Sequence, residues 1–219
     1  MATLLLVEGK QDVEFLTQFI KKANLGSCRS HPATEPADFV LKAADSYERL
    51  RAGLPDELRS SQFSRFGIIP DADSNPAARW QSITTRLLQI EERSTRLFEH
   101  LPPAPGKDGT ILQSLTGRTI GIWLWPHNTT AGDLEAFAGH LTPANDPLWL
   151  HAAATLASLP ETRYREGHRH KARIHTWLAW QNPPGQSLGI AVAKGNLEIS
   201  GESAANLLAF LTKLKEEPT

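Results

Sequence analysis

The sequence predicts an α/β fold in which helices flank a mostly parallel sheet, followed by a mainly helical C-terminal extension. Three short apolar runs lead to this prediction: Leu4–Val7, Phe66–Ile69 and Thr119–Trp125. Continuous apolar runs of this length are typical of strands buried on both faces, as in parallel sheets. Residues with helical spacing follow each run, and such alternation of strands and helices indicates a parallel α/β sheet.

The first strand is expected at Leu4–Val7 and is followed at once by a helix. Val13, Leu16 and Ile20 recur at helical spacing and would form the buried stripe of this helix. We expect Gly26 to end it, because glycine readily takes the left-handed conformation found after helix C-termini.

The segment between the first two apolar runs is less regular. A short strand is expected near Cys28–His31, and a second helix is expected from Pro36 to Arg51. The Gly-Leu-Pro segment at 53–55 is expected to break that helix, because proline lacks the N–H group that an internal turn requires.

The second apolar run, Phe66–Ile69, precedes a helix with a clear N-terminal signal. Ser74 or Asn75 would cap this helix, and Pro76 would occupy its first position, where the missing N–H leaves no hydrogen bond unmade. The Pro- and Gly-rich segment 101–109 is expected to be a loop that leads towards the third apolar run.

The third apolar run, Thr119–Trp125, ends in a polar turn and a further helix with Leu134, Phe137 and Leu141 on its buried side. Leu188–Ala193 is expected to form a short strand or an apolar loop. Three more helices are expected, at Pro147–Leu159, Arg169–Trp180 and Ala204–Lys215.

The length of 219 residues fits one large domain or one domain with an extension. We expect an α/β core at residues 1–145 and a C-terminal extension at residues 146–219 that packs on this core. The net charge of -1 provides no global attraction to nucleic acids or membranes, so such a partner would need a local charged patch.

The cysteine content and the N-terminal segment indicate the cellular compartment in which the protein is expected. Cys28 is the single cysteine, which excludes an internal disulfide and suits a reducing compartment. The apolar start, MATLLLVEG, is too short for a signal peptide and has no basic leader. No apolar run approaches the ~20 residues of a membrane-spanning helix. We therefore expect a cytoplasmic protein without a membrane partner.

Acidic residues follow the predicted strands. Glu8 comes directly after the first apolar run, and Asp71 and Asp73 follow the second. Asp12 lies one turn into the first helix, and Glu135 follows the third run. Because functional groups gather at the carboxyl ends of parallel strands, these five side chains are expected to converge.

Convergence would create a strong electrostatic conflict. Two carboxylates ~5 Å apart repel by ~3 kcal/mol at an effective dielectric of ~20. A hard divalent cation with oxygen ligands would remove that repulsion, and Mg²⁺ leaves coordination positions open for phosphate oxygens. Acids after strands also serve as helix caps, so the Asp-x-Asp pattern by itself equally fits a turn that caps a helix. The presence of both acidic motifs favours the metal interpretation.

The two acidic motifs resemble those of the Toprim domain, which topoisomerases, primases and OLD-family nucleases share. Its signature is Glu-Gly-x-x-Asp after the first strand and Asp-x-Asp after a later one. Matching residues here are Glu8, Gly9 and Asp12, and then Asp71 and Asp73. The resemblance covers about residues 3–140 and implies a Toprim/Rossmann-like core.

A closer resemblance is to a small standalone Toprim-like family related to OLD-type nucleases. It is carried by GDLEAF at Gly132–Phe137 and by KARIHTWLAWQNPPG at Lys171–Gly185. This resemblance implies Mg²⁺ (or Mn²⁺) as cofactor and a catalytic role for Glu8. Lys171 would be the late lysine of the OLD-type site, and Lys10 is the local candidate. The implied metal ligands are Glu8, Asp12, Asp71, Asp73 and Glu135.

The implied function is divalent-metal-dependent phosphodiester chemistry on DNA or RNA, as in a nuclease or nickase. An alternative is a Toprim-like module that binds nucleotides or nucleic acid without catalysis. A third is phosphoacceptor signalling at Asp71, although Glu8-Gly9 fits that class poorly. No Walker A motif is present, since PGKDGT lacks its spacing, so an ATPase would have to be a partner protein.

A basic cluster at Glu161–His175 has a net charge of +3 with its histidines neutral. It could hold phosphates or form a solvated helix face. The arginines expected to contact nucleic acid are Arg163, Arg165, Arg169 and Arg173. The spacing of His168, His170 and His175 puts them on different helix faces, which disfavours zinc.

Overall fold

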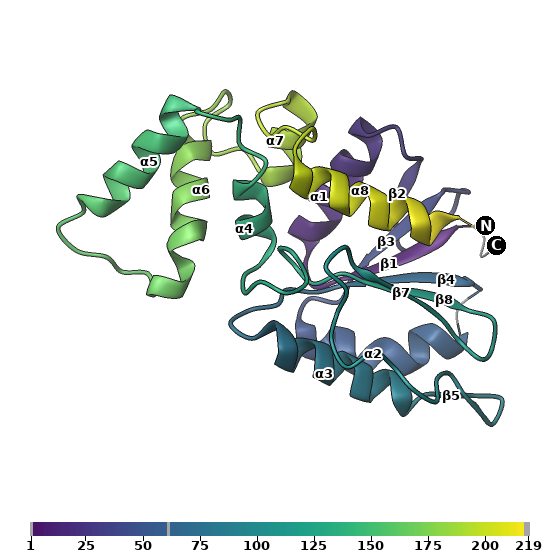
Figure 1. The fold of residues 1–219 in the computed structure, drawn as a ribbon. Helices are drawn as coiled ribbons and strands as arrows, with labels where there is room; N and C mark the ends of the chain where they lie inside the picture. Colours follow the sequence, from purple (N-terminus) through teal and green to yellow (C-terminus); the bar gives the residue numbers. More distant parts are fainter. Residues whose placement is uncertain (1, 61, 217–219) are drawn as a thin grey trace.

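The computed structural model describes residues 2–60 and 62–216 and contains a six-stranded sheet (Figure 1). All neighbouring strands are parallel except the last pair, which is antiparallel. In spatial order the strands are β2 (Cys28–Ser30), β3 (Phe39–Ala43), β1 (Thr3–Val7), β4 (Arg65–Ile69), β8 (Thr119–Ile122) and β7 (Thr110–Gln113). The predicted fold class is confirmed, and the three apolar runs form adjacent strands.

Both faces of the sheet are covered, which explains why the strand sequences are continuously apolar. In β1, Leu5 and Val7 point into one hydrophobic cluster, while Leu4 and Leu6 point into the other. Every residue of β1 and β4 is buried. A strand with water on one face would have shown alternating polar residues instead.

The helices form one layer on each side of the sheet (Figure 1). On one side, α2 (Tyr47–Ser60) and α3 (Pro76–Leu88) pack with Leu54, Trp80 and Ile83 in the cluster of Leu4. The cluster of Leu5 lies on the other side. The helices that cover this face of the sheet are α1 (Lys10–Lys22), α4 (Leu134–Gly139), α7 (Leu188–Lys194) and α8 (Glu202–Lys215) (Figure 1).

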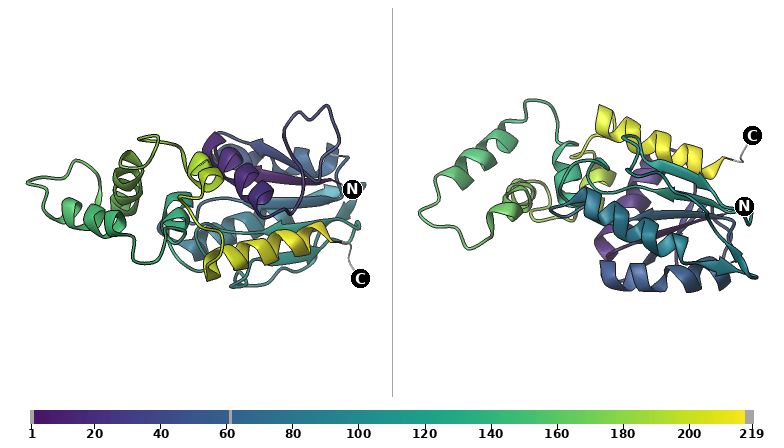
Figure 2. Two further views of the ribbon diagram at one scale, coloured as in Figure 1. Left: turned by 90° about the horizontal axis from the view of Figure 1, so that it is seen from above. Right: turned by 60° about the horizontal axis from the view of Figure 1, so that its bottom comes forward.

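A pair of helices projects from this layered core (Figure 2). Helix α5 (Pro147–Ala157) packs against α6 (Arg169–Ala179), which a short 3-10 turn, η1 (Glu166–His168), precedes. We call residues 147–179 the helical arm. Its α6 contacts α4, so the arm meets the core beside the start of that helix. None of the described helices is both long and apolar enough to cross a membrane.

The predicted helix at Pro36–Arg51 is wrong. Residues Phe39–Ala43 form strand β3, and the helix begins only at Tyr47. Pairing with β1 buries Phe39, Val40 and Leu41, and this tertiary pairing overrides the helical pattern in the sequence.

The prediction that the Gly-Leu-Pro segment at 53–55 breaks the helix is also wrong, because the segment lies inside α2. Pro55 removes one backbone donor, but Leu54 and Leu58 beside it are fully buried in the core. This packing holds the helix together.

Leu188–Ala193 is also helical rather than a strand or loop. Ser187 caps α7 by accepting a hydrogen bond from the backbone N–H of Ile190. Gly195, with φ of 83°, ends the helix in the left-handed conformation. Helix α1 ends at Lys22, earlier than expected from Gly26.

Other expectations are confirmed. Asn75 caps α3 by accepting from the N–H of Ala78, and Pro76 occupies the first position. A strand is present at Cys28–Ser30, and α5, α6 and α8 lie where helices were expected. The sequence did not indicate strand β7 or the small hairpin of β5 (Glu91–Glu92) and β6 (Thr95–Arg96).

Two glycines let α8 lie directly on the sheet. Gly67 on β4 is the register partner of Gly121 on β8. A Cβ atom at Gly121 would lie 2.9 Å from Cζ of Phe210 and 3.0 Å from Cδ1 of Leu214, both on α8. Those contacts are too close, so a side chain here would push the helix away from the strands.

We expect Gly121→Ala to lower the free energy of unfolding by ~1–3 kcal/mol through overpacking. Gly53→Ala is the matched control, because nothing lies within 4 Å of a Cβ atom there and the residue is inside a helix. The control should leave stability unchanged or raise it by ~0.5–1 kcal/mol. Urea denaturation followed by circular dichroism measures both. Equal stability of the two variants would contradict the close packing of α8.

Candidate functional site

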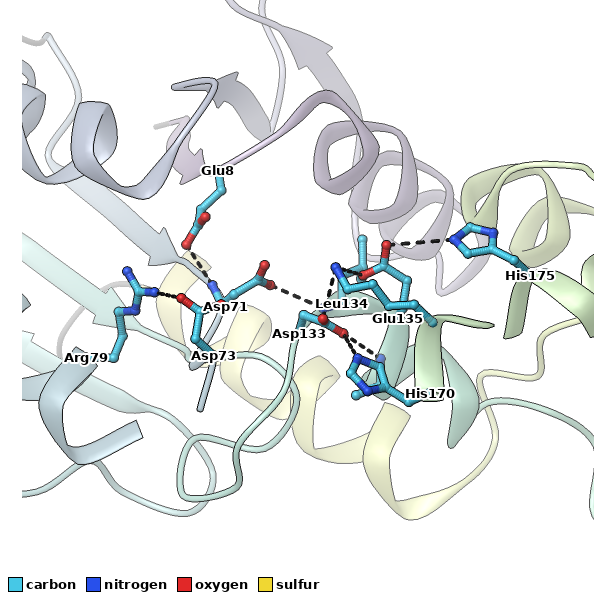
Figure 3. Close-up of polar contacts among 11 residues, drawn as sticks. Glu8, Asp71, Asp73, Arg79, Asp133, Leu134, Glu135, His170 and His175 are labelled. Carbon is cyan, nitrogen blue, oxygen red and sulfur yellow. Dashed lines mark hydrogen bonds and ion pairs between the residues drawn. The ribbon is translucent and has the colours of Figure 1, made fainter. Parts of the chain in front are cut away.

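The carboxyl ends of β1 and β4 bring two acidic residues together. Val7 and Ile69 are register partners at the ends of these parallel strands. Glu8 follows immediately, and the backbone N–H of Asp71 donates to its Oε1 at 3.0 Å. Figure 3 shows Glu8 and Asp71 in this contact. The expected convergence of these two residues is therefore observed.

Asp71 joins three elements at the centre of the site. The backbone of Asp71 forms an isolated parallel β-bridge with the backbone of Trp125, beyond the end of β8. Its Oδ1 accepts from the N–H of Leu134 at 3.2 Å, at the start of α4. Burial raises the pKa of Asp71 to about 9 together with the charges of other carboxylates, of which Asp12 and Glu8 have the largest effects. Without a cation, this carboxyl group keeps its proton at neutral pH.

Asp12 has a structural role as well as a place in the site. Its Oδ2 accepts from the N–H of Gly9 at 3.0 Å and caps α1, and its Oδ1 accepts from Nε1 of Trp125 at 3.0 Å. Burial raises the pKa of Asp12 to about 6 in spite of these hydrogen bonds. Burial likewise raises the pKa of Glu8 to about 7, against the opposing hydrogen bond from Asp71.

Asp73 does not join the other acids. It forms an ion pair with Arg79, and its side chain is 64% exposed. Arg79 is itself held 3.4 Å above the ring of Tyr47. The backbone of Asp73 has a φ of 51° and pairs with Gly132 in an antiparallel bridge. The carboxylate of the second aspartate in the Asp-x-Asp pattern is therefore held by Arg79, although its negative charge still raises the pKa of Glu8.

A second acidic pair comes from the start of α4. Asp133 caps this helix by accepting from the N–H of Ala136 at 3.0 Å, and Glu135 lies in its first turn. Nζ of Lys171, in the helical arm, lies 3.0 Å from Oδ2 of Asp133 and 3.3 Å from Oε2 of Glu135. Burial lowers the pKa of Lys171, but the attraction of both carboxylates outweighs it and keeps that pKa well above its usual range.

Two histidines of α6 reach the same acids (Figure 3). Nε2 of His170 lies 2.7 Å from Oδ1 of Asp133, which is a short hydrogen bond. His175 is farther away, with 4.0 Å between its Nε2 and Oε1 of Glu135. Burial favours the neutral form of Asp133, but the hydrogen bonds from His170 and Lys171 prevail, and its pKa lies below the usual value.

Sequence reasoning missed Asp133 and His170 as site residues. GDLEAF contains the cap signal of Asp133, because an aspartate directly before a helix is a common cap. Nothing in the sequence signals that His170, 37 positions later, hydrogen bonds to it. Only the packing of α6 on α4 creates this pair.

These side chains line two neighbouring pockets. The first, which we call the acid pocket, has a volume of about 290 Å³. Its charged lining residues are Glu8, Lys10, Asp12, Asp45, Asp71, Glu135 and Lys171. The second, the arm pocket, has a volume of about 560 Å³ and shares Lys171 with the first. Its charged or titratable lining residues are Asp73, Asp133, Arg165, His168, His170 and Lys171.

The four arginines of the basic cluster separate into different roles. Arg163 is 92% exposed and pairs with Glu161, whereas Arg165 lines the arm pocket. Arg173 lies 3.7 Å above the ring of Trp149 and donates to the backbone carbonyl of that residue, so it holds α6 to α5. Arg169 pairs with Glu166.

The donor set of the acid pocket fits a hard divalent cation, because it consists of carboxylate oxygens and three of these groups, Glu8, Asp12 and Asp71, have raised pKa values. Within residues 2–60 and 62–216, however, no group of three or more His, Cys, Asp or Glu side chains is arranged to hold one metal ion. Glu8, Asp71 and Glu135 would have to turn inward to share an ion.

The fold and the site define an α/β protein with an acidic pocket at the carboxyl ends of adjacent parallel strands. The chain belongs to the family described as "Protein of unknown function (DUF3226)", whose family model matches residues 2–216. No curated protein and no solved structure matches the chain.

The raised pKa of Asp71 predicts a pH-dependent stability of the metal-free protein. The folded protein binds this proton up to a pH of about 9, whereas the ordinary value is 3.8. The resulting stabilisation is complete below the ordinary pKa and is lost as the pH rises through the folded pKa. The melting temperature in chelator should therefore fall between ~pH 5 and ~pH 8.

Asp71→Asn should reduce that fall, because the amide cannot ionise but can still accept from Leu134. Asp73→Asn, outside the acid pocket, is the matched control and should change this dependence far less, because it removes only a minor contribution to the pKa of Glu8. Thermal melts of the three proteins at both pH values provide the measurement. Identical pH dependence in all three would show that Asp71 is not the responsible group.

Proposed function

We propose that the protein cleaves or nicks nucleic acid with Mg²⁺ or Mn²⁺ as its cofactor. The observation that supports this best is the pairing of Glu8 with Asp71 in a pocket that Lys171 also lines. Such a pocket combines carboxylate oxygens for a hard cation with a fixed positive charge for a phosphate. The Toprim-like resemblance of the two acidic motifs agrees with this chemistry.

In this proposal Glu8, Asp71 and Glu135 hold the metal ion. Asp12 supports them indirectly, because both of its oxygens accept hydrogen bonds that fix the start of α1 and Trp125. Asp73 stays with Arg79 and has no direct part. When bound, the ion would neutralise the carboxylates, polarise a phosphoryl oxygen and favour ionisation of water.

The residues of the chain supply the remaining functions. Glu8 accepts the proton of the attacking water, because it lies at the edge of the acid pocket where that water would be held. Lys171 is a permanent positive charge beside the acid pocket and stabilises the negative charge that develops on the phosphoryl group. Lys10, at the exposed rim of the same pocket, is placed to contact a phosphate.

Arg165 is the arginine best placed to bind the nucleic acid backbone, because it lines the arm pocket next to Lys171. Arg163 and Arg169 would add exposed positive charge nearby. Arg173 is committed to Trp149 and is not included. We also propose a cytoplasmic location, which the single cysteine supports. Any ATPase step would belong to a partner protein, since this sequence contains no Walker A motif.

A second candidate function is a module that binds nucleotides or nucleic acid without catalysis. Two ion pairs favour this function. Lys171 and Glu135 already neutralise each other, and Asp73 is paired with Arg79. In that case the acid pocket would bind a metal–nucleotide complex without turnover.

Glu8→Gln should lower the rate of cleavage by ~10²–10⁴-fold, because it removes the proton acceptor. Lys171→Ala should lower the rate while metal binding is retained, because Lys171 acts on the phosphate. A screen of plasmid, single-stranded DNA and RNA with Mg²⁺ or Mn²⁺ measures the activity. If the wild type cuts none of these, or if Glu8→Gln cuts as well as the wild type, the binding-module function replaces the nuclease function.

Metal affinity should depend on Asp71 and not on Asp73. We expect Asp71→Ala to weaken Mn²⁺ binding by at least ~10-fold, because a ligand should matter at least as much as an outer-shell partner. Asp73→Ala should bind Mn²⁺ as the wild type does, because its side chain pairs with Arg79 outside the acid pocket. Isothermal titration calorimetry with Mn²⁺ tests both variants. Equal losses in the two would contradict the separation of these aspartates.

A further inference from the structure

Asp133 and His170 form a short hydrogen bond between α4 and α6, beside the arm pocket. The residue Asp133 is only 6% exposed, and its Oδ1 lies 2.7 Å from Nε2 of His170. Two more donors fix the carboxylate, the N–H of Ala136 at 3.0 Å and Nζ of Lys171 at 3.0 Å. The carboxylate therefore has little freedom to move, and it holds the imidazole in one orientation.

This hydrogen bond determines which nitrogen of His170 is available. Because a carboxylate can only accept, Nε2 carries a proton. Nδ1 has no hydrogen-bond partner in the part of the chain that the structure describes, residues 2–60 and 62–216. The side chain of His170 is 32% exposed and lines the arm pocket. A ring held at one nitrogen with the other one free is the arrangement of a catalytic histidine.

His170 lies on the opposite side of the acidic site from Glu8. Figure 3 shows Glu8 on one side of Asp71 and His170, beyond Asp133, on the other. In an in-line displacement at phosphorus, the attacking and leaving oxygens are on opposite sides. If water is activated at Glu8, the leaving oxygen departs towards the arm pocket, where His170 lies.

Other cations near the site are poorer proton donors. Lys171 sits between two carboxylates and so keeps its proton. His175 is 54% exposed and lies 4.0 Å from the acidic oxygen of Glu135, which is too far for a hydrogen bond that would orient its ring. The ring of His170, by contrast, is oriented by Asp133 through Nε2.

We propose that His170 is a catalytic acid that protonates the leaving oxygen of the phosphodiester, and that Asp133 is the positioning residue that orients it. This role rests on the proposed function. The oxygen of water bonds to phosphorus while the bond from phosphorus to the leaving oxygen breaks and its electron pair stays on that oxygen. The water proton goes to the carboxylate of Glu8, and the Nδ1 proton of the His170 imidazolium goes to the leaving oxygen. The products are an alcohol and a phosphate monoester, and exchange with solvent returns both residues to their starting states.

The test compares two leaving groups. An alkoxide leaving from single-stranded DNA or RNA needs a proton, whereas nitrophenolate leaving from the p-nitrophenyl ester of thymidine 5′-monophosphate does not. His170→Gln keeps an N–H donor for Asp133 but has no proton to transfer. We expect this variant to cleave the nucleic acid ~10²–10⁴-fold more slowly than the wild type and the nitrophenyl ester less than ~10-fold more slowly.

Controls separate the role of His170 from effects on folding or metal binding. His151→Gln changes a histidine of the arm that packs against Trp180, away from both pockets, and should leave both rates unchanged. Melting temperature and calorimetry with Mn²⁺ should be the same for His170→Gln and the wild type. A structural role predicts the opposite pattern, in which both substrates slow by the same factor.

The outcomes also distinguish this role from the proposed function. If the wild type cleaves both substrates and His170→Gln loses the same factor on each, or loses nothing, His170 is not the acid and the nuclease function stands. If the wild type cleaves the ester but no nucleic acid, protonation of the leaving group is absent and the role of His170 is also overturned. If the wild type cleaves neither, the proposed function falls and this role falls with it.

Discussion

The arrangement of the candidate site follows from carboxylates that are buried at the ends of two adjacent parallel strands. The register of β1 and β4 brings Glu8 beside Asp71, and the backbone N–H of Asp71 donates to the glutamate. Since such groups repel by ~3 kcal/mol at ~5 Å, the surrounding elements have to compensate for them. The start of α4 contributes the N–H of Leu134, and Trp125 contributes its indole to Asp12. Even so, Asp71 has a pKa of about 9. In the metal-free protein its carboxyl group is therefore protonated near neutral pH, which removes its repulsion with the other carboxylates.

The same electrostatics connect the helical arm to the core. Lys171 and His170 are consecutive residues of α6, and both contact Asp133 at the start of α4. These contacts place a fixed positive charge and an oriented imidazole beside the acid pocket. Because the contacts that position the arm also neutralise the acids, the stability of the arm and the chemistry of the site are coupled.

Much of the fold could be predicted, and the failures have a common cause. The runs that became β1, β4 and β8 were recognisable because both faces of each strand are buried. The segment Phe39–Ala43 was misassigned as a helix, since its strand conformation comes from pairing between β1 and β2. Of the candidate site, Glu8 and Asp71 were predicted together correctly, but the structure directs Asp73 to Arg79.

The sequence by itself determined the α/β class, the order of the three buried strands and the acids that follow them, because local apolar patterns and strand ends are encoded in neighbouring residues. Tertiary structure alone decided which acids share a pocket and which are paired with cations. It also decided that His170 meets Asp133, because two residues 37 positions apart come together only through the packing of α6 on α4. Side-chain partners across such distances depend on the arrangement of whole elements, which no local pattern records.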